Sequence, residues 1–92
     1  SNVTLYAIYK KDLKVKYTKG SNITSIYKEV NNNEEEITEE ICSIYNNETQ
    51  CNVTLPNLKA DTGYIPAGFK NSKEDFADHG EKIIIDDEGI KF

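Results

Sequence analysis

Two cysteines, Cys42 and Cys51, constrain this chain more than any other feature. The segment that holds them reads CSIYNNETQCNVTL, with a pair of asparagines between two runs of alternating polar and apolar residues. Asn tolerates a positive φ, which a type I′ turn needs at both of its central positions, here Asn46 and Asn47. The pattern therefore predicts a β-hairpin closed by its own disulfide.

The predicted hairpin has one preferred register. Its cross-strand pairs are Tyr45–Glu48, Ile44–Thr49, Ser43–Gln50 and Cys42–Cys51. Because the pair beside the tip is hydrogen-bonded and the pairs then alternate, the cysteines form a non-hydrogen-bonded pair with Cα atoms about 4.5 Å apart. A disulfide accepts roughly 4.4–6.8 Å, so the bridge Cys42–Cys51 is predicted. Disulfides persist in oxidising compartments, which indicates an extracellular location.

The composition indicates one small domain with a marginal core. The chain has 92 residues, of which 37% are hydrophobic, and it lacks Trp and Met. Its net charge of −5 argues against nucleic acid or an anionic membrane surface as a partner. No apolar run approaches the ~20 residues of a membrane span, so we expect no direct membrane insertion. The chain begins inside a strand-like pattern, and we expect it to be a piece of a longer protein.

Several short segments alternate as β-strands do. Val3–Tyr9 reads as a strand with both faces partly covered, and Leu13–Thr18 as a half-buried strand. Tyr64–Phe69 and Lys82–Ile85 follow the disulfide segment as two further short strands. The polar stretch 71–80 is expected to begin with one helical turn that places Phe76 inward.

One segment has helical periodicity. Ile23, Ile26, Tyr27 and Val30 lie at positions i, i+3, i+4 and i+7, which predicts a short helix. The predicted fold is therefore α+β and mainly β, a β-grasp-like mixed sheet of four to five strands with one short helix. A small β-sandwich is the alternative if residues 23–30 form a strand.

The sequence contains few residues in patterns typical of a catalytic or metal-binding site. His79 is its single histidine, and no Ser or Cys has a base and an orienting group beside it, so we predict that it is not an enzyme. The acidic stretch Asn31–Glu40 has consecutive carboxylates and no Gly, unlike a calcium loop, which favours a solvated loop over a cation site. We expect no metal and no cofactor.

Four Asn-x-Thr sequons begin at Asn2, Asn22, Asn47 and Asn52. One interpretation is a glycosylated eukaryotic surface antigen, of which this chain is a fragment. The other is that these residues are the polar positions of exposed strands in a chain rich in Asn. The alternation around residue 52 favours the second interpretation.

Six tyrosines are many for a chain of this length. Those that could form a binding surface on the sheet are Tyr6, Tyr17, Tyr45 and Tyr64. Exposed aromatic side chains can bind carbohydrate or a host protein. More often such residues lie at the edge of a core, which is the interpretation we favour.

Two stretches resemble a known family. Asn2–Tyr9, NVTLYAIY, resembles the closing strand of the internalin-type B repeat, also called the Listeria–Bacteroides repeat. Gly63–Phe69, GYIPAGF, resembles the Gly-Tyr-x-x-x-Gly-Trp segment of that family, with Phe69 in the place of Trp. The middle of the chain is similar to the disulfide-bearing variant found in tandem repeats of Gram-positive surface proteins.

The resemblance implies a β-grasp module and a function. Residues 1–12 would hold a strand that closes a preceding repeat, and residues 13–92 would form a single surface-repeat domain. Such modules serve as stalk, spacer or adhesion segments on the bacterial cell wall or cell surface, and they have no catalytic residues. The implied partners are neighbouring repeats of the same chain, with a host protein or a carbohydrate as further candidates.

Overall fold

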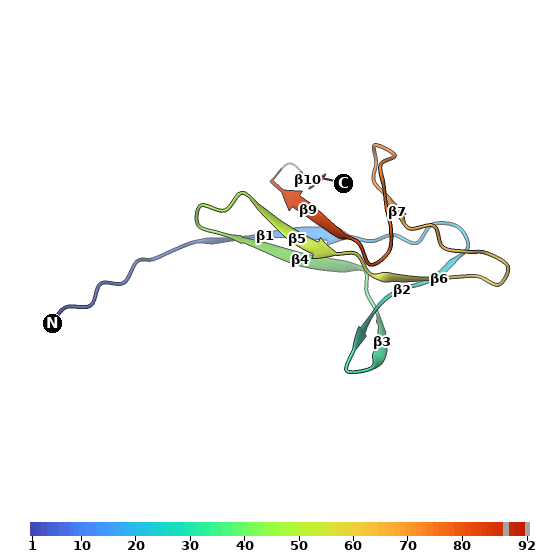
Figure 1. The fold of residues 1–92 in the computed structure, drawn as a ribbon, viewed down its shortest axis with the longest axis horizontal. Coiled ribbons are helices and arrows are strands. Elements are labelled where there is room, and N and C mark those ends of the chain that lie inside the picture. Colours follow the sequence, from blue (N-terminus) through green and yellow to red (C-terminus); the bar gives the residue numbers. More distant parts are fainter. Residues whose placement is uncertain (88, 92) are drawn as a thin grey trace.

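The computed structural model describes the backbone of residues 1–87 and 89–91 and the side chains of residues 1–87. Within these ranges the chain forms ten strands and no helix (Figure 1). The strands are β1 (Lys10–Lys16), β2 (Ile23–Val30), β3 (Asn33–Glu36), β4 (Glu39–Tyr45), β5 (Gln50–Thr54), β6 (Asn57–Ala60), β7 (Phe69–Lys70), β8 (Phe76–Ala77), β9 (Lys82–Asp86) and β10 (Gly89–Lys91). The fold is therefore all-β, and the predicted α+β, β-grasp-like fold with one short helix is wrong.

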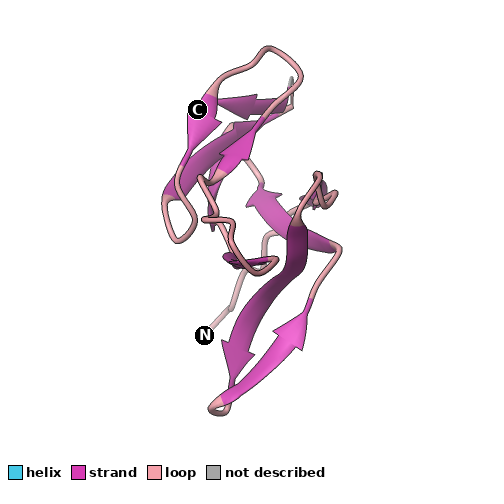
Figure 2. Ribbon diagram, turned by 90° about the vertical axis from the view of Figure 1, so that its right-hand side faces the viewer, coloured by secondary structure: helices cyan, strands magenta, loops and turns pink. Residues whose placement is uncertain are grey.

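The strands pair in four small antiparallel sheets. The strand orders are β1-β4, β10-β9-β5, β3-β2-β6 and β7-β8. The stretch that runs through β3 and β4 changes its partner at residues 37 and 38. The Ile37 N–H donates to the carbonyl of Ile26 in β2, at 3.0 Å, while the Thr38 carbonyl accepts from the N–H of Tyr17, at 2.8 Å. One extended stretch thus joins two sheets (Figure 2).

The residues expected to form a helix are strand β2, and a β-bulge explains the error. Ile23 pairs with Ala60 and Ser25 with Lys59, so β2 advances two residues while β6 advances one. A bulge of this kind reverses which side chains face inward beyond it. Ile23 and Ile26, three residues apart, therefore line the same hollow. The bulge produces on a strand the i, i+3 spacing that is typical of a helix.

The N-terminal residues form no strand, contrary to the prediction for Val3–Tyr9. They leave the sheet at Lys10 and extend away from the body of the molecule (Figure 1). Leu5 is 89% exposed and Tyr6 84%, where partly covered faces were expected. At the end of this segment, the Tyr9 carbonyl accepts a hydrogen bond from the N–H of Asn46 at 2.9 Å. Residues 1–9 are called the N-terminal arm below.

The core lies between the sheet β1-β4 and the sheet β10-β9-β5. Each sheet contributes the inward half of an alternating strand, as in the burial of Val15 on β1 and of Ile83 and Ile85 on β9. The other buried hydrophobic residues of this cluster are Tyr17, Ile26, Cys42, Val53, Leu55, Leu58 and Ala77. β-branched and aromatic side chains suit such a half-buried pleated surface.

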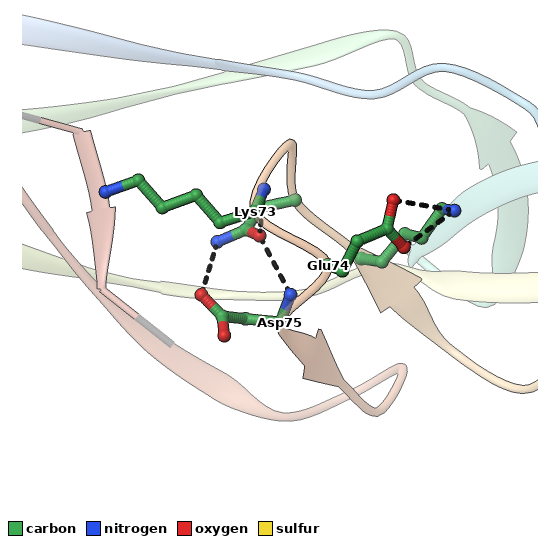
Figure 3. Close-up of polar contacts among 5 residues, drawn as sticks. Lys73, Glu74 and Asp75 are labelled. Atoms are coloured by element: carbon green, nitrogen blue, oxygen red, sulfur yellow. Dashed lines mark hydrogen bonds and ion pairs between the residues drawn. The ribbon is translucent and has the colours of Figure 1, made fainter.

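Residues between β6 and β9 also differ from the prediction. Tyr64–Ile65 lie in a loop where a strand was expected, and the strand β7 begins only at Phe69. The expected helical turn is the tight loop of the hairpin β7-β8, and Phe76 is 70% exposed rather than placed inward. In this loop the Asn71 Oδ1 accepts the backbone N–H groups of Lys73 at 2.9 Å and Asp75 at 3.0 Å (Figure 3). These are the local bonds by which Asn competes with a helix.

Candidate functional site

The disulfide Cys42–Cys51 is present, as predicted, but the strands that carry it do not form a hairpin. β4 pairs with β1, whereas β5 pairs with β9, so the bridge joins two different sheets. The two Cα atoms are 6.2 Å apart, inside the range that a disulfide accepts. The turn between the strands is closed by the Glu48 N–H, which donates to the Tyr45 carbonyl at 2.9 Å. We call residues 42–51 the disulfide arch.

Burial explains why the arch replaces the predicted hairpin. Cys42 and Ile44 are 6% and 4% exposed and face inward from one sheet, while Val53, at 7%, faces inward from the other. In a hairpin these strands would share one sheet, and a separate layer would be needed to cover them. In the arch they face each other across the core and cover one another. The spacing of the cysteines is compatible with both arrangements, and the demand for burial selects the second.

The four candidate binding tyrosines are not brought together. Tyr17 is 8% exposed and belongs to the core, where its ring lies 5.6 Å from that of Phe69. Tyr6 is in the N-terminal arm, Tyr45 ends β4, and Tyr64 lies in the loop at the opposite end of the molecule from the arm (Figure 1). The arm, which holds Tyr6, and the connection between β4 and β5, which follows Tyr45, lie towards the same end (Figure 1).

Tyr17 is part of a polar network at the side of the core. Its hydroxyl donates to the Glu40 carboxylate at 2.7 Å, and the Lys28 ammonium contacts the other oxygen of Glu40 at 2.5 Å. Burial raises the pKa of Tyr17 far above its ordinary value, and the hydrogen bond and negative charge of Glu40 add to the shift. The folded state therefore strongly favours the neutral phenol.

The raised pKa of Tyr17 predicts a pH dependence of stability. Above pH 10 the unfolded chain loses this proton while the folded chain keeps it, so the free energy of unfolding falls as the pH rises. This loss cannot exceed about 1.4 kcal/mol per pH unit for one proton, and solvent screening makes it smaller. Urea unfolding at several pH values should show the Tyr17→Phe variant losing less stability above pH 10 than the wild type. Tyr64→Phe, which removes the hydroxyl of an exposed tyrosine, should keep the wild-type slope, and equal slopes for all three proteins would contradict the assignment.

The acidic stretch Asn31–Glu40 is mostly strand, and four of its five carboxylates make ion pairs with lysines. The ion pairs are Glu34–Lys59 at 2.7 Å, Glu36–Lys19 at 3.8 Å, Glu39–Lys14 at 3.2 Å and Glu40–Lys28 at 2.5 Å. The side chains described contain no group of three or more His, Cys, Asp or Glu placed to hold a metal ion. The solvated loop expected here is in fact β3 and the start of β4, with a turn at residues 31–32.

The sequence did not indicate an apolar hollow of about 360 Å³ beside the core. Its walls include Ile23, Ile26, Leu58, Phe69 and Phe76, with two lysines, Lys19 and Lys70, among the lining residues. Both lysines make ion pairs, with Glu36 and Glu74 respectively. The hollow depends on the bulge in β2 and on the hairpin β7-β8, and neither could be recognised from alternation alone.

The four sequon asparagines, Asn2, Asn22, Asn47 and Asn52, are all exposed. Asn22 has a φ of 64° and lies in a turn, and Asn52 lies on the outward face of β5. Exposure is expected both for glycan acceptors and for the polar positions of strands, so it does not separate the two interpretations.

Comparison with known proteins does not assign the chain to a family. No family model matches it, and neither a curated protein nor a solved structure shows significant similarity to it. The disulfide itself indicates an oxidising environment of the extracellular type. The residues that the structure describes form no helix that is long and apolar enough to cross a membrane.

Proposed function

We propose that this chain is a non-enzymatic extracellular module of a bacterial cell-surface protein and acts as a stalk, spacer or adhesion segment. The observation that carries the proposal is the disulfide that joins two sheets of an elongated chain, whose principal extents are 68 × 34 × 16 Å. A small domain outside the cell needs such a bridge, because its own core gives only marginal stability. The resemblance of NVTLYAIY and GYIPAGF to a surface repeat supports the same class of protein.

The positions of the ionisable groups agree with a structural role. Glu39 of β4 makes an ion pair with Lys14 of the neighbouring strand β1. Glu34 of β3 reaches Lys59 of β6 across β2, and Glu40 of β4 reaches Lys28 of β2 in another sheet. Tyr17 and Glu40 are engaged with each other at the side of the core. These groups hold strands together, and the partners we propose are neighbouring repeats of the same chain.

The proposal is tested by protease treatment of intact cells of the source organism, followed by mass spectrometry of the released peptides. Peptides from this chain should appear before those of a cytoplasmic marker protein. Alkylation before and after reduction of the same peptides should show Cys42 and Cys51 protected until the reductant is added. Release only after cell lysis, or alkylation of both cysteines without reductant, would overturn the extracellular assignment.

Binding through tyrosines is the competing function, and a binding screen separates it from a spacer. Tyr45 is 47% exposed and Tyr64 57%, so each is accessible. Tyr45 ends β4 and Tyr64 belongs to the loop between β6 and β7, and the connection after β4 and that loop lie towards opposite ends of the molecule (Figure 1). We expect the purified chain to bind neither a carbohydrate array nor host matrix proteins. Binding that Tyr45→Ser or Tyr64→Ser abolishes, and that Tyr27→Ser leaves intact, would replace the spacer role with a binding role.

A further inference from the structure

The N-terminal arm has the side-chain pattern of a strand without a partner. Its exposed apolar residues include Val3 at 84%, Leu5 at 89% and Tyr9 at 60%. These odd positions continue, without a break in phase, into the odd positions of β1 that face the core, such as Leu13 and Val15, and on to Tyr17 directly after β1. An exposed apolar segment of this kind marks an interaction site. The described residues contain no strand that pairs with the arm.

β1 has an open edge that suits such a strand. Tyr17 and Tyr9 hydrogen-bond through their backbones to the stretch that contains β4, so the odd residues of β1 direct their N–H and C=O groups towards β4. The even residues, Lys10, Asp12, Lys14 and Lys16, direct theirs to the opposite side. As β1 pairs only with β4 in the described part of the chain, that row of backbone groups is unpaired. Such an edge is a template for strand addition.

We propose that two copies of this chain form a symmetric dimer in which the arm of each copy pairs antiparallel with the open edge of β1 in the other. The arm points away from its own body, so it meets a second copy rather than its own sheet (Figure 1). Because the same surface serves both copies, the contact closes around a two-fold axis. The resulting sheet has the order β4-β1-β1-β4. This inference goes beyond the stalk proposal and does not depend on it.

The direction of the backbone groups restricts the register. Even residues must face even residues, which leaves three central registers, with residue 8, 9 or 10 opposite its own copy. In one of them Tyr9 faces its own copy, and the inward pairs are Val3–Val15, Leu5–Leu13 and Ala7–Lys11. This register places the small side chain of Ala7 opposite Lys11, which already makes an ion pair with Asp87 at 2.7 Å.

The outward pairs help to decide among the three registers. With Tyr9 on the axis, they are Thr4–Lys14, Tyr6–Asp12 and Ile8–Lys10, so no lysine directly faces another. A shift in one direction would place Lys10 directly opposite Lys10 of the second copy. Like charges directly opposite one another in a sheet are destabilising. A shift in the other direction puts Ile8 on the axis and places Leu5 opposite Lys11 on the inward face, where the Tyr9 register places it opposite Leu13. The structure therefore favours Tyr9 on the two-fold axis.

Sedimentation velocity over a range of concentrations tests the dimer on the whole chain. The mass should rise from 10.4 kDa to twice that value as the concentration increases. Leu5→Asp places a charge on the inward face and should weaken the dimer at least about tenfold, since a buried Leu contributes about 1.5–3 kcal/mol. Thr4→Asp places the same charge on the outward face, opposite Lys14, and should leave the dissociation constant within about threefold.

Cross-linking tests the register independently. Both native cysteines lie in the disulfide, so an introduced thiol is free to react with its copy. Under mild oxidation Tyr9→Cys should form a covalent dimer, because odd pairs are non-hydrogen-bonded and their Cα atoms approach to about 4.5 Å. Ile8→Cys is the matched control, since its two copies are diagonal neighbours beyond the ~7 Å reach of a disulfide.

Three results would overturn the proposal. One is a monomer at every concentration, and another is equal weakening by Leu5→Asp and Thr4→Asp. The third is equal cross-linking at positions 8 and 9, which would indicate a mobile arm without register. Unchanged thermal unfolding of Leu5→Asp is expected, because the arm lies outside the core, and it confirms that the variant reports on association.

Discussion

Gly68→Ala is expected to destabilise the fold by at least about 3 kcal/mol. An alanine Cβ at this position would lie 2.4 Å from the carbonyl oxygen of Ala77. That oxygen belongs to the backbone of β8, so the overlap cannot be relieved by a side-chain rotation. The φ of Gly68 is +117°, which costs an L-residue about 1–3 kcal/mol in addition to the overlap. Urea unfolding followed by circular dichroism measures the change.

Two other glycines separate the causes of this effect. Gly63→Ala has a φ of +91° but nothing within 4 Å of the added Cβ, so it should cost only the backbone strain, about 1 kcal/mol. Gly20→Ala has neither a positive φ nor a close neighbour and should change stability by less than about 0.5 kcal/mol. The explanation fails if Gly68→Ala is no more destabilising than Gly63→Ala.

Removal of the disulfide should have the second largest effect. The double variant Cys42→Ala, Cys51→Ala opens a loop of about ten residues, which on the chain-entropy model costs about 2.5–3 kcal/mol. That is a large share of the stability of a domain of this size, expected at about 5 kcal/mol or somewhat more. The wild type in reductant should unfold at the same urea concentration as the double variant.

The arch also predicts which backbone amides lose protection against hydrogen exchange when the disulfide is removed. Because the bridge joins two sheets, hydrogen exchange should accelerate in β4 and β1 as well as in β5 and β9. A bridge confined to one hairpin would loosen only the residues between the cysteines. Thr49→Ala, an exposed change inside the arch, should leave stability and exchange unchanged, which makes it the matched control. Faster exchange restricted to residues 43–50 would contradict the arch.

The sequence predicted the bridge for a physical reason that does not depend on the fold. Any short connection that lets Cys42 and Cys51 approach satisfies the distance condition, in a hairpin and in an arch alike. The choice between them depends on which layer covers Ile44 and Val53. That layer includes β9, about thirty residues further along the chain, and local periodicity contains no information about it.

The helix between residues 23 and 30 was predicted from a spacing of apolar residues that is real, but a β-bulge in a strand causes it. Apolar residues three apart share a face on a helix, but they also share a face on a strand that contains a bulge between them. Thr24 lies at that position in β2. β-branched residues at 23, 24, 26 and 30 favour the strand, and this signal could have been weighed against the spacing.

Part of the candidate site could not be predicted from the sequence either. The Tyr17–Glu40–Lys28 network joins strands β4 and β2 to the residue that follows β1. The hollow beside Phe69 needs the β2-β6 pair and the hairpin β7-β8. The N-terminal arm shows the opposite case. Its alternation was recognised as that of a strand, but a strand also needs a neighbour, and no strand in the part of the chain that the structure describes pairs with it.

The arch turns residues 42–51 into a small macrocycle held at both ends by the core. Its tip, from Tyr45 to Gln50, is exposed and contributes no residue to the buried cluster. Since the covalent ring and the two sheets fix where the tip begins and ends, foreign peptides could be displayed there in a constrained form. The module would then serve as a scaffold for loop libraries, with Cys42 and Cys51 as its fixed frame.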